Sequence, residues 1–248
     1  MSARTRRPQL SAQARLAEIP GIGNTLARKL VRRGIKTRAQ LRTIIDELPL
    51  EAQVHLRYNV SRSIPLAVGK TIVAEMKRRL VYAGHRKYPL IAVGSVRRET
   101  PVLKDIDILV VVPDDTDLQN ILSSAELREP SPSDVLSIVE SYASGVRRRS
   151  FVVRYAQRHK RPKYYDVDLF LATKGEKPYA LFHYSNGRNY NIRIRAHAKR
   201  RGLKLDQYGL YVAGTKKKAP GSANIKTERD LTRFLGVTYR QPKDRTNA

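Results

Sequence analysis

The sequence predicts an α+β protein with a helical front, a central mixed sheet and a mixed helical and stranded tail. Apolar residues recur at helical spacing up to about residue 82. Short β-branched segments bounded by turn residues follow, and helical spacing returns from about residue 176. This order is typical of α+β subdomains around a groove. We therefore expect a basic arm over residues 1–15, a helical subdomain over 16–86, a sheet subdomain over 87–175 and a C-terminal subdomain over 176–248.

The composition is that of a folded and strongly basic protein. The 248 residues include 49 Lys and Arg against 22 Asp and Glu, a formal net charge of +27, and 41% are hydrophobic. Such an excess indicates a polyanionic partner, which could be DNA, RNA or an anionic membrane. The sequence contains no cysteine, no apolar run long enough to span a bilayer and no secretory signal. We expect a cytoplasmic or nuclear protein that is not secreted, has no membrane partner and has no disulfide or thiolate metal site.

Three helices are expected in the front part. "NTLARKLVRRG" places Leu26 and Leu30 at helical spacing and ends at Gly34. "TRAQLRTII" begins with Thr37 as the expected N-cap. "GKTIVAEMKRRLVYAG" runs up to Gly84 with its apolar residues on one face.

The stretch "IPGIGNTLARKLVRRG" is the first motif that suggests binding. Gly21 and Gly23 allow the backbone N–H groups at the start of a helix to approach a phosphate, and Arg28 and Lys29 follow. The alternative is an ordinary packing corner between helices. The stretch resembles a helix-hairpin-helix motif, which grips the DNA backbone without reading bases. That resemblance implies Na⁺ or K⁺ bound by the backbone carbonyls of Ala17, Ile19 and Ile22.

The central part is expected to contain four strands and one helix. The strands are "YPLIAVGS", "DIDILVVVP", "RSFVVRYAQ" and "KYYDVDLFLA", and "SPSDVLSIVESYAS" is expected to be a helix that begins near Ser131 or Ser133. In the tail, "KPYALFHYS" and "YNIRIRAHAKRRG" predict helices and "LKLDQYGLYV" predicts a hairpin. A last helix, "TERDLTRFLG", opens with a capping box of Thr227 and Asp230.

Paired carboxylates on two strands predict a metal site. Asp105 and Asp107 stand two apart beside a strongly apolar strand, so they share a face, and Asp166 and Asp168 repeat the pattern later. Buried carboxylates are costly without a cation, and an all-oxygen ligand set suits Mg²⁺ or Mn²⁺. Two ions about 4 Å apart would activate a hydroxyl and stabilise a leaving oxygen in an in-line displacement. The alternative is that each aspartate caps a turn at a strand edge.

The stretch "VGSVRR" predicts a phosphate site next to these carboxylates. Gly94 and Ser95 end a strand and begin a short helix, whose N–H groups and hydroxyl suit an anion. Arg97 and Arg98 add positive charge, and Arg98 is the better candidate to reach a phosphate. A metal-bound triphosphate would fit between this turn and the carboxylates.

Taken together, these motifs resemble the DNA polymerase X family. The resemblance extends from "IPGIGNTLARKLVRRGIKTRAQLR" through "GSVRR" and "DIDIL" to "NIRIRAHAKRRGLKLDQYGL" and "YRQPKDR", and covers nearly all of residues 16–246. It implies a nucleotidyltransferase-fold palm, a mixed β-sheet with flanking helices. It also implies an N-terminal helix-hairpin-helix subdomain and a C-terminal α/β subdomain that binds nucleotide and template.

The resemblance also implies roles for individual residues. Asp105 and Asp107 would bind both metal ions, and Asp168 would complete the ion on the side of the primer 3′-hydroxyl. Gly94, Ser95 and Arg98 would hold the dNTP triphosphate. Further residues that would contact nucleotide or DNA are His183 and Tyr184 beside the sugar, Asn191 on the incoming nucleotide, Arg195 on the template strand, and Lys199 beside the duplex.

The expected activity is the filling of short DNA gaps in base excision repair, by nucleotidyl transfer from dNTP to a primer 3′-hydroxyl. About 15 residues precede the hairpin motif, so the chain is similar to small viral members of the family and we expect no lyase activity. Expected partners are gapped or nicked duplex DNA, dNTPs and a DNA ligase, with the enzyme acting as a monomer, and a viral replication site is a further location. The alternatives are a template-independent terminal nucleotidyltransferase and a catalytically inactive DNA-binding protein.

Overall fold

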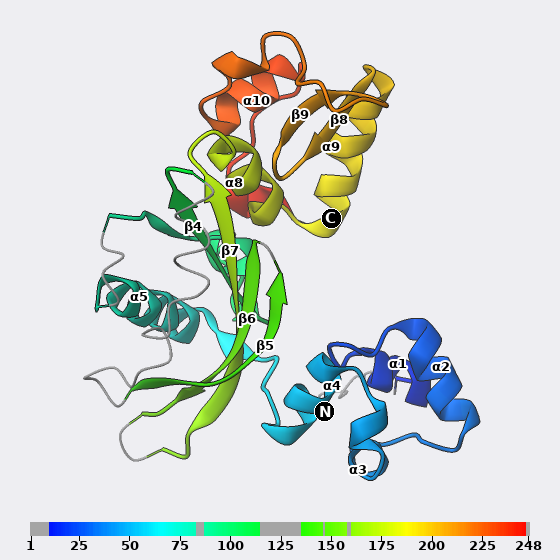
Figure 1. The fold of residues 1–248 in the computed structure, drawn as a ribbon. Coiled ribbons are helices and arrows are strands. Elements are labelled where there is room, and N and C mark those ends of the chain that lie inside the picture. The colour runs from blue at the N-terminus through cyan, green and yellow to red at the C-terminus, as the bar shows by residue number, and fades with distance from the viewer. Residues whose placement is uncertain (1–9, 83–86, 115–134, 146, 158–159, 247–248) are drawn as a thin grey trace, which may run out of the picture. The chain divides into compact units, whose positions relative to one another are not determined.

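The computed structural model describes residues 10–82, 87–114, 135–145, 147–157 and 160–246. The chain divides into two compact units, Met1–Val60 and Ser61–Ala248 (Figure 1).

The first unit is helical. Its helices are α1 (Ala12–Ala17), α2 (Asn24–Arg32), α3 (Arg38–Arg42) and α4 (Leu50–Arg57), with a 3₁₀ helix at Ile45–Glu47. They enclose an apolar cluster that includes Leu16, Ile22 and Leu30. Thr37 caps α3 as predicted, in a capping box with Gln40.

The predicted basic arm is wrong over residues 12–15. Helix α1 begins at Ala12, because the Ser11 side chain caps it by accepting a hydrogen bond from the Ala14 N–H. The helix ends at Ala17, and its residue Leu16 is buried. Residues 1–9 of the predicted arm lie outside the described part of the chain.

The second unit contains a mixed five-stranded sheet in the order β2-β4-β7-β6-β5. Strands β4 and β7 are parallel, and the other neighbouring pairs are antiparallel. This sheet and its flanking helices confirm the predicted α+β class. The strands are β2 (Leu90–Ala92), β4 (Ile106–Val112), β5 (Leu136–Gly145), β6 (Arg148–Tyr155) and β7 (Lys163–Thr173), and a separate ladder pairs β1 (Ile64–Pro65) with β3 (Val102–Leu103).

The predicted helix over "SPSDVLSIVESYAS" is wrong where the structure describes it. Leu136–Gly145 forms β5, which pairs antiparallel with β6 through two register shifts. A short apolar run cannot be assigned to helix or strand by its periodicity alone. The free edge of β6 decides the outcome, because its backbone N–H and C=O groups are satisfied by β5. Residues 131–134 lie outside the described part.

Helix α5 (Leu66–Tyr82) covers one face of this sheet (Figure 1). Ile72, Met76 and Leu80 of α5 are buried in one cluster with Ile108 and Val153 of the strands. Helix α5 thus shares the apolar core of the sheet, and the division between the two units falls after Val60, whereas the boundary at residue 86 stays a prediction.

The C-terminal residues surround a second apolar cluster, which includes Tyr179, Phe182, Ile194, Leu210 and Leu231. The hairpin β8–β9 and the capping box of Thr227 and Asp230 are present as predicted. The elements are α8 (Lys177–Ser185), α9 (Arg188–Arg200), β8 (Leu203–Asp206), β9 (Gly209–Val212) and α10 (Glu228–Phe234), with 3₁₀ helices at Ser222–Asn224 and Pro242–Asp244. No helix in the described part of the chain is long and apolar enough to cross a membrane.

Candidate active site

Four aspartates lie along one face of the sheet. Asp107 on β4 is directly paired with Asp168 on β7 in the parallel ladder. Asp105 and Asp166 stand two residues before them, and side chains two apart in a strand share a face. Ile106 and Val167, the residues between the aspartates of each pair, are buried in the cluster that contains residues of α5. The four carboxylates therefore occupy the face opposite α5.

Burial and mutual repulsion raise the pKa values of Asp105, Asp107 and Asp168. Burial raises the pKa of Asp107 well above its ordinary value, and the charges of Asp105 and Asp168 raise it further. Burial is also the main reason why the pKa values of Asp105 and Asp168 are raised, with the charge of Asp166 adding to it. A divalent cation would relieve this repulsion.

Asp168 and Asp166 are held by neighbouring strands. The Arg148 guanidinium donates from Nε and Nη2 to Oδ1 of Asp168 at 3.1 and 2.9 Å, and from Nη2 to Oδ2 at 2.9 Å. The Ser150 hydroxyl also donates to Asp168, and the Tyr142 hydroxyl donates to Asp166. Among the described residues, no group of three or more His, Asp or Glu side chains is arranged, as the structure stands, to hold a metal ion.

The predicted phosphate turn lies directly against Asp107. Gly94 begins the single-turn helix α6 (Gly94–Arg97) with a φ of +56°, a left-handed conformation that favours glycine. A Cβ atom on Gly94 would lie 1.8 Å from Oδ2 of Asp107. The Ser95 hydroxyl oxygen is buried and has no hydrogen-bond partner in the structure. This turn therefore offers an unused hydroxyl next to the carboxylates, and a buried polar group without a partner is unusual enough to suggest a ligand.

Both arginines of this turn form hydrogen bonds to Ser185, and Arg97 also reaches α10. Burial lowers the pKa of Arg98, and the charges of Asp107 and Asp105 act in the opposite direction. Arg98 therefore interacts electrostatically with the carboxylate cluster. Its Nη1 donates to the Ser185 carbonyl at 3.1 Å. Arg97 donates to the Ser185 hydroxyl at 2.6 Å and to Glu228 of α10 at 2.6 and 3.1 Å.

Gly94→Ala is expected to reduce nucleotide incorporation by about a hundredfold or more. The added methyl group meets the Asp107 carboxylate, and alanine also disfavours the left-handed backbone at this position. Single-turnover incorporation into a primed template measures the effect. Gly175→Ala is the matched control, because a Cβ there meets no atom within 4 Å and should leave the rate within about twofold of wild type.

His183, Asn191 and Arg195 form one hydrogen-bonded group between α8 and α9. Asn191 Nδ2 donates to the His183 carbonyl at 2.8 Å, and Arg195 Nη2 lies 2.8 Å from Nδ1 of His183. Burial, with the charge of Arg195 adding to it, lowers the pKa of His183 to about 4, so its imidazole is neutral at pH 7. The Tyr184 ring stacks on Phe170 of β7 with centroids 4.1 Å apart, and Lys199 is exposed on α9.

The predicted helix-hairpin-helix motif, which would bind the DNA backbone, lies in the first unit. Gly21 has a φ of +80°, and a Cβ there would lie 2.8 Å from the Ala52 nitrogen, so the turn requires glycine. Gly23 is the N-cap of α2, and Arg28 and Lys29 on that helix are exposed. The Ile19 carbonyl accepts a hydrogen bond from the Ile22 N–H at 3.0 Å. The monovalent cation at Ala17, Ile19 and Ile22 stays a prediction.

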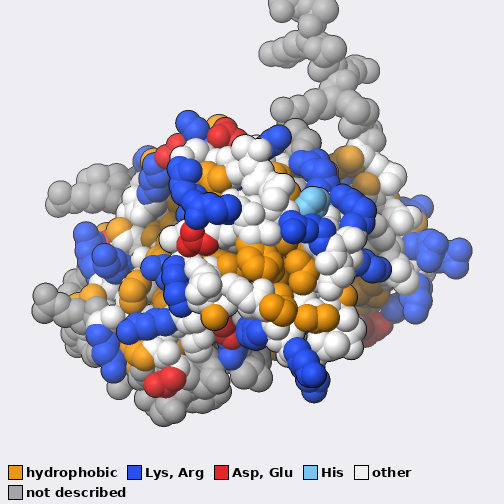
Figure 2. Space-filling model, turned by 90° about the horizontal axis from the view of Figure 1, so that it is seen from above, with side chains coloured by type: hydrophobic (Ala, Val, Ile, Leu, Met, Phe, Trp, Pro, Cys, Tyr) orange, Lys and Arg blue, Asp and Glu red, His pale blue; other side chains and the backbone are white. Residues whose placement is uncertain are grey.

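Basic side chains are widespread on the face formed by the C-terminal elements. Figure 2 shows Lys and Arg side chains distributed over that face around a smaller apolar area, with few Asp and Glu between them. A groove of about 600 Å³ is lined by Arg193, His197, Arg200 and Arg240. Such a surface suits the phosphates of a nucleic acid.

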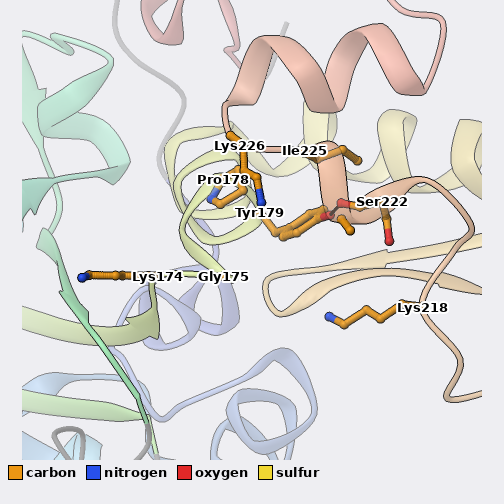
Figure 3. A pocket seen from close by; sticks show the side chains of 9 residues that line it. Lys174, Gly175, Pro178, Tyr179, Lys218, Ser222, Ile225 and Lys226 are labelled. Atoms are coloured by element: carbon orange, nitrogen blue, oxygen red, sulfur yellow. Dashed lines mark hydrogen bonds between the residues drawn. The ribbon is translucent and has the colours of Figure 1, made fainter.

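Two features of the second unit could not be found from the sequence. Arg148 stands in the run "GVRRRSF", in which nothing distinguishes one arginine from the next. A cavity of about 550 Å³ is lined by Lys174, Lys218 and Lys226, which surround Tyr179 and Ser222 (Figure 3). The Tyr179 hydroxyl donates to the Ser222 carbonyl at 3.1 Å, and none of these residues was a predicted site residue.

Comparisons with known proteins identify related polymerases. The family model "DNA polymerase beta thumb" matches residues 180–246. The Repair DNA polymerase X of African swine fever virus (strain Badajoz 1971 Vero-adapted) is 35% identical over 188 residues, which cover 73% of this chain and 99% of the viral protein. DNA polymerase lambda of Rattus norvegicus is 29% identical over 169 residues, 62% of this chain and 28% of that protein.

Solved structures share the fold. Leishmania infantum polymerase beta in a ternary gap complex has a TM-score of 0.79 with 21% identity, covering 98% of this chain and 92% of that chain. The same polymerase in a ternary P/T complex has a TM-score of 0.78 with 21% identity, covering 96% of this chain and 99% of that chain. Since the viral relative is matched over almost its whole length, the chain belongs to the DNA polymerase X family.

Proposed function

We propose that this DNA-directed DNA polymerase fills short gaps in duplex DNA during base excision repair, by transferring a nucleotide from a dNTP to a primer 3′-hydroxyl. The pairing of Asp107 with Asp168, next to the turn that carries Ser95, is the observation that carries the proposal. Support also comes from a family relative that is a repair polymerase and from a fold shared with a polymerase in a gap complex.

Asp105, Asp107 and Asp168 would hold two Mg²⁺ or Mn²⁺ ions. Their ligands would all be oxygen atoms, which these ions prefer, and their raised pKa values reflect a charge that a cation would compensate. Bound there, the ions would activate the attacking hydroxyl and stabilise the leaving oxygen. Asp168 is paired with Arg148, so it would have to lose this contact before it could act as a ligand of the ions.

The chain's own residues would position the nucleotide. The free Ser95 hydroxyl and Arg98 would hold the triphosphate, and glycine at position 94 keeps the space that Asp107 occupies. His183 and Tyr184 would lie beside the sugar and Asn191 on the nucleotide, with the neutral His183 imidazole oriented by Arg195. Each of these contacts orients the substrate before the chemical step.

DNA would be held mainly through its phosphates. Arg195 and Lys199 of α9 would contact the template side of the duplex, and Gly21, Gly23, Arg28 and Lys29 would grip the backbone, with Na⁺ or K⁺ at the hairpin carbonyls. Gapped or nicked duplexes and dNTPs are then the substrates. The enzyme would act as a monomer, and a DNA ligase would seal the nick that remains after filling.

Primer extension on a duplex with a one-nucleotide gap tests this function. Each of the four dNTPs is supplied alone, with and without Mg²⁺, and a single-stranded primer of the same sequence is the comparison substrate. We expect incorporation of the complementary nucleotide, only with the metal, and at least about tenfold faster on the gapped duplex. Asp168→Asn is the inactive reference.

Two results would contradict the proposal. Equally fast extension of the single-stranded primer, without regard to the template base, would identify a terminal nucleotidyltransferase. No incorporation with any nucleotide in Mg²⁺ or Mn²⁺, together with tight DNA binding, would identify an inactive DNA-binding protein.

A further inference from the structure

We infer that Arg148 is an internal counter-ion that occupies Asp168 in the metal-free enzyme and has to be displaced before Asp168 can bind a divalent ion. The inference rests on the proposed metal-dependent function and concerns the same carboxylate. It makes Arg148 a residue that acts on the reaction through Asp168, without contacting the reacting atoms.

The geometry of the pair supports competition for the same oxygen atoms. Arg148 contacts both carboxylate oxygens of Asp168, at 2.9 Å for Oδ2 and at 2.9 and 3.1 Å for Oδ1. The Ser150 hydroxyl donates to Oδ1 as well. A divalent ion binds carboxylate oxygen at about 2.0–2.1 Å for Mg²⁺. A guanidinium on the same two oxygens would then face the ion at close range, and the two like charges would repel each other.

Arg148 reaches Asp168 because of the strand register. In the antiparallel ladder, Ser150 lies opposite Asp168 and Arg148 lies opposite Phe170. Opposed residues share a face, so Arg148, Ser150 and the carboxylates are on the same side of the sheet. The Arg148 guanidinium thereby reaches the Asp168 carboxylate on β7, with which it forms an ion pair.

Arg148 can leave without disturbing the core. Its side chain is 46% exposed, whereas that of Asp168 is 12% exposed. The guanidinium also lies 5.8 Å from the centre of the Phe170 ring, which provides a neighbouring surface for it. Because the arginine of the pair reaches solvent, it can be exchanged for a divalent ion without opening the core.

Asp168 and Asp107 have different contacts in this structure. Asp168 is turned toward β6 by Arg148 and Ser150 while Asp107 lies against Gly94. No three acidic or histidine side chains among the described residues form a metal-binding group in this arrangement. Release of Arg148 frees Asp168 to turn toward Asp107, its direct neighbour in the ladder.

Binding of Mn²⁺ to the full-length protein, without DNA or nucleotide, tests the inference. Free Mn²⁺ is counted by electron paramagnetic resonance during a titration. We expect Arg148→Ala to lower the Kd for Mn²⁺ by about three- to tenfold, because the competing cation is gone. The Kd of Arg148→Lys for Mn²⁺ should lie between those of wild type and Arg148→Ala, because lysine keeps the charge and loses the bidentate contact.

Arg154→Ala is the matched control. Arg154 lies on the same strand, six residues away and on the same face, where it is opposite Tyr164. The Arg154→Ala variant removes the same charge far from Asp168, so its Kd for Mn²⁺ should stay within about twofold of wild type. In the Asp168→Asn background, Arg148→Ala should have no further effect, because the two groups act as one pair.

Thermal unfolding provides a second readout. Metal-free Arg148→Ala should melt below wild type, because Asp168 loses its partner, and saturating Mn²⁺ should reduce that difference. A Kd for Arg148→Ala that is equal to or weaker than wild type would overturn the inference. Tight Mn²⁺ binding by Arg148→Ala together with wild-type affinity in Arg148→Lys would also overturn it, because the positive charge alone would then explain the effect. A melting difference between Arg148→Ala and wild type that Mn²⁺ leaves unchanged would overturn it as well.

The same titration separates this inference from the proposed function. If wild type binds Mn²⁺ and Asp168→Asn weakens that binding while Arg148→Ala changes nothing, the displacement is wrong and the metal site stands. If wild type binds no Mn²⁺ in the millimolar range and Asp168→Asn makes no difference, the proposed metal site is itself wrong.

Discussion

Asp107→Asn is expected to abolish nucleotide incorporation and, at the same time, to stabilise the metal-free protein. Incorporation should fall by about a thousandfold or more, because a shared ligand of both proposed ions is lost. The stabilisation arises because Asp107 is a buried carboxylate whose pKa is raised well above its ordinary value, first by burial and then by Asp105 and Asp168. Asparagine has the same shape and removes a charge that folding has to bury.

The pH dependence of this effect has a definite sign. A carboxylate whose pKa is raised on folding reduces stability as the pH rises from its ordinary pKa, about 3.9, through the raised folded value. The melting temperature of Asp107→Asn should therefore exceed that of wild type at neutral pH, and the difference should vanish under acid conditions where Asp107 is protonated.

Differential scanning calorimetry across pH, with and without Mg²⁺, measures this stabilisation. A change of about 1 kcal/mol corresponds to about 2–4 °C for a domain of this size. Mg²⁺ should raise the melting temperature of wild type more than that of the variant. Asp114→Asn, at an exposed position beyond the end of β4, should change neither activity nor the pH profile. A lower melting temperature for Asp107→Asn in the metal-free state would show that the buried charge is already compensated.

Glu228→Gln is expected to lower the free energy of unfolding strongly. Glu228 accepts hydrogen bonds from Arg97 of α6 at 2.6 and 3.1 Å and from Arg245 of the C-terminal segment at 2.6 Å. Arg245 is completely buried. Removal of the carboxylate charge leaves two guanidinium groups that are no longer neutralised, which costs about 3–5 kcal/mol. The expected result is a melting temperature lower by about 6–20 °C.

The pKa of Glu228 predicts how this stabilisation depends on pH. Burial alone would raise the pKa, but the hydrogen bonds and charges of Arg97 and Arg245 outweigh it and hold the pKa below its ordinary value. A lowered folded pKa contributes stability that is present above about pH 4.3, the ordinary value, and is lost as the pH falls through the folded pKa. Glu228→Gln should lack this loss at low pH.

Glu99→Gln is the control for the second substitution. Glu99 pairs with Lys70 at 3.8 Å, and both side chains are more than half exposed, at 60% and 57%. Its replacement should change the free energy of unfolding by less than about 1 kcal/mol. If Glu228→Gln unfolds at the same temperature as Glu99→Gln, the buried cluster does not hold α6 and the C-terminal segment together.

Local patterns predicted most of the secondary structure. Helical spacing and caps identified α2, α3, α9 and α10, and β-branched runs identified β2, β4, β6 and β7. The prediction was wrong for β5, where "VLSIVESYAS" fits a helix as well as a strand. The deciding partner is β6, whose edge β5 completes, and local spacing does not reveal it. The packing of α5 on the apolar face of the sheet likewise depends on strands later in the chain.

The sequence by itself determined which chemical groups this protein can bring together in pairs. The spacing of Asp105 with Asp107 and of Asp166 with Asp168 places each pair on one face, because the side chains of a strand alternate with a period of two. The glycine before Ser95 likewise marks a turn whose backbone is left-handed.

Only the tertiary structure decided how those pairs meet. It placed Asp107 opposite Asp168, joined Glu228 to Arg97 and Arg245, and selected Arg148 from a run of arginines as the partner of Asp168. The physical reason is that strand register and packing depend on hydrogen bonds and apolar contacts between distant segments, and local spacing carries no information about which distant residue will be the neighbour.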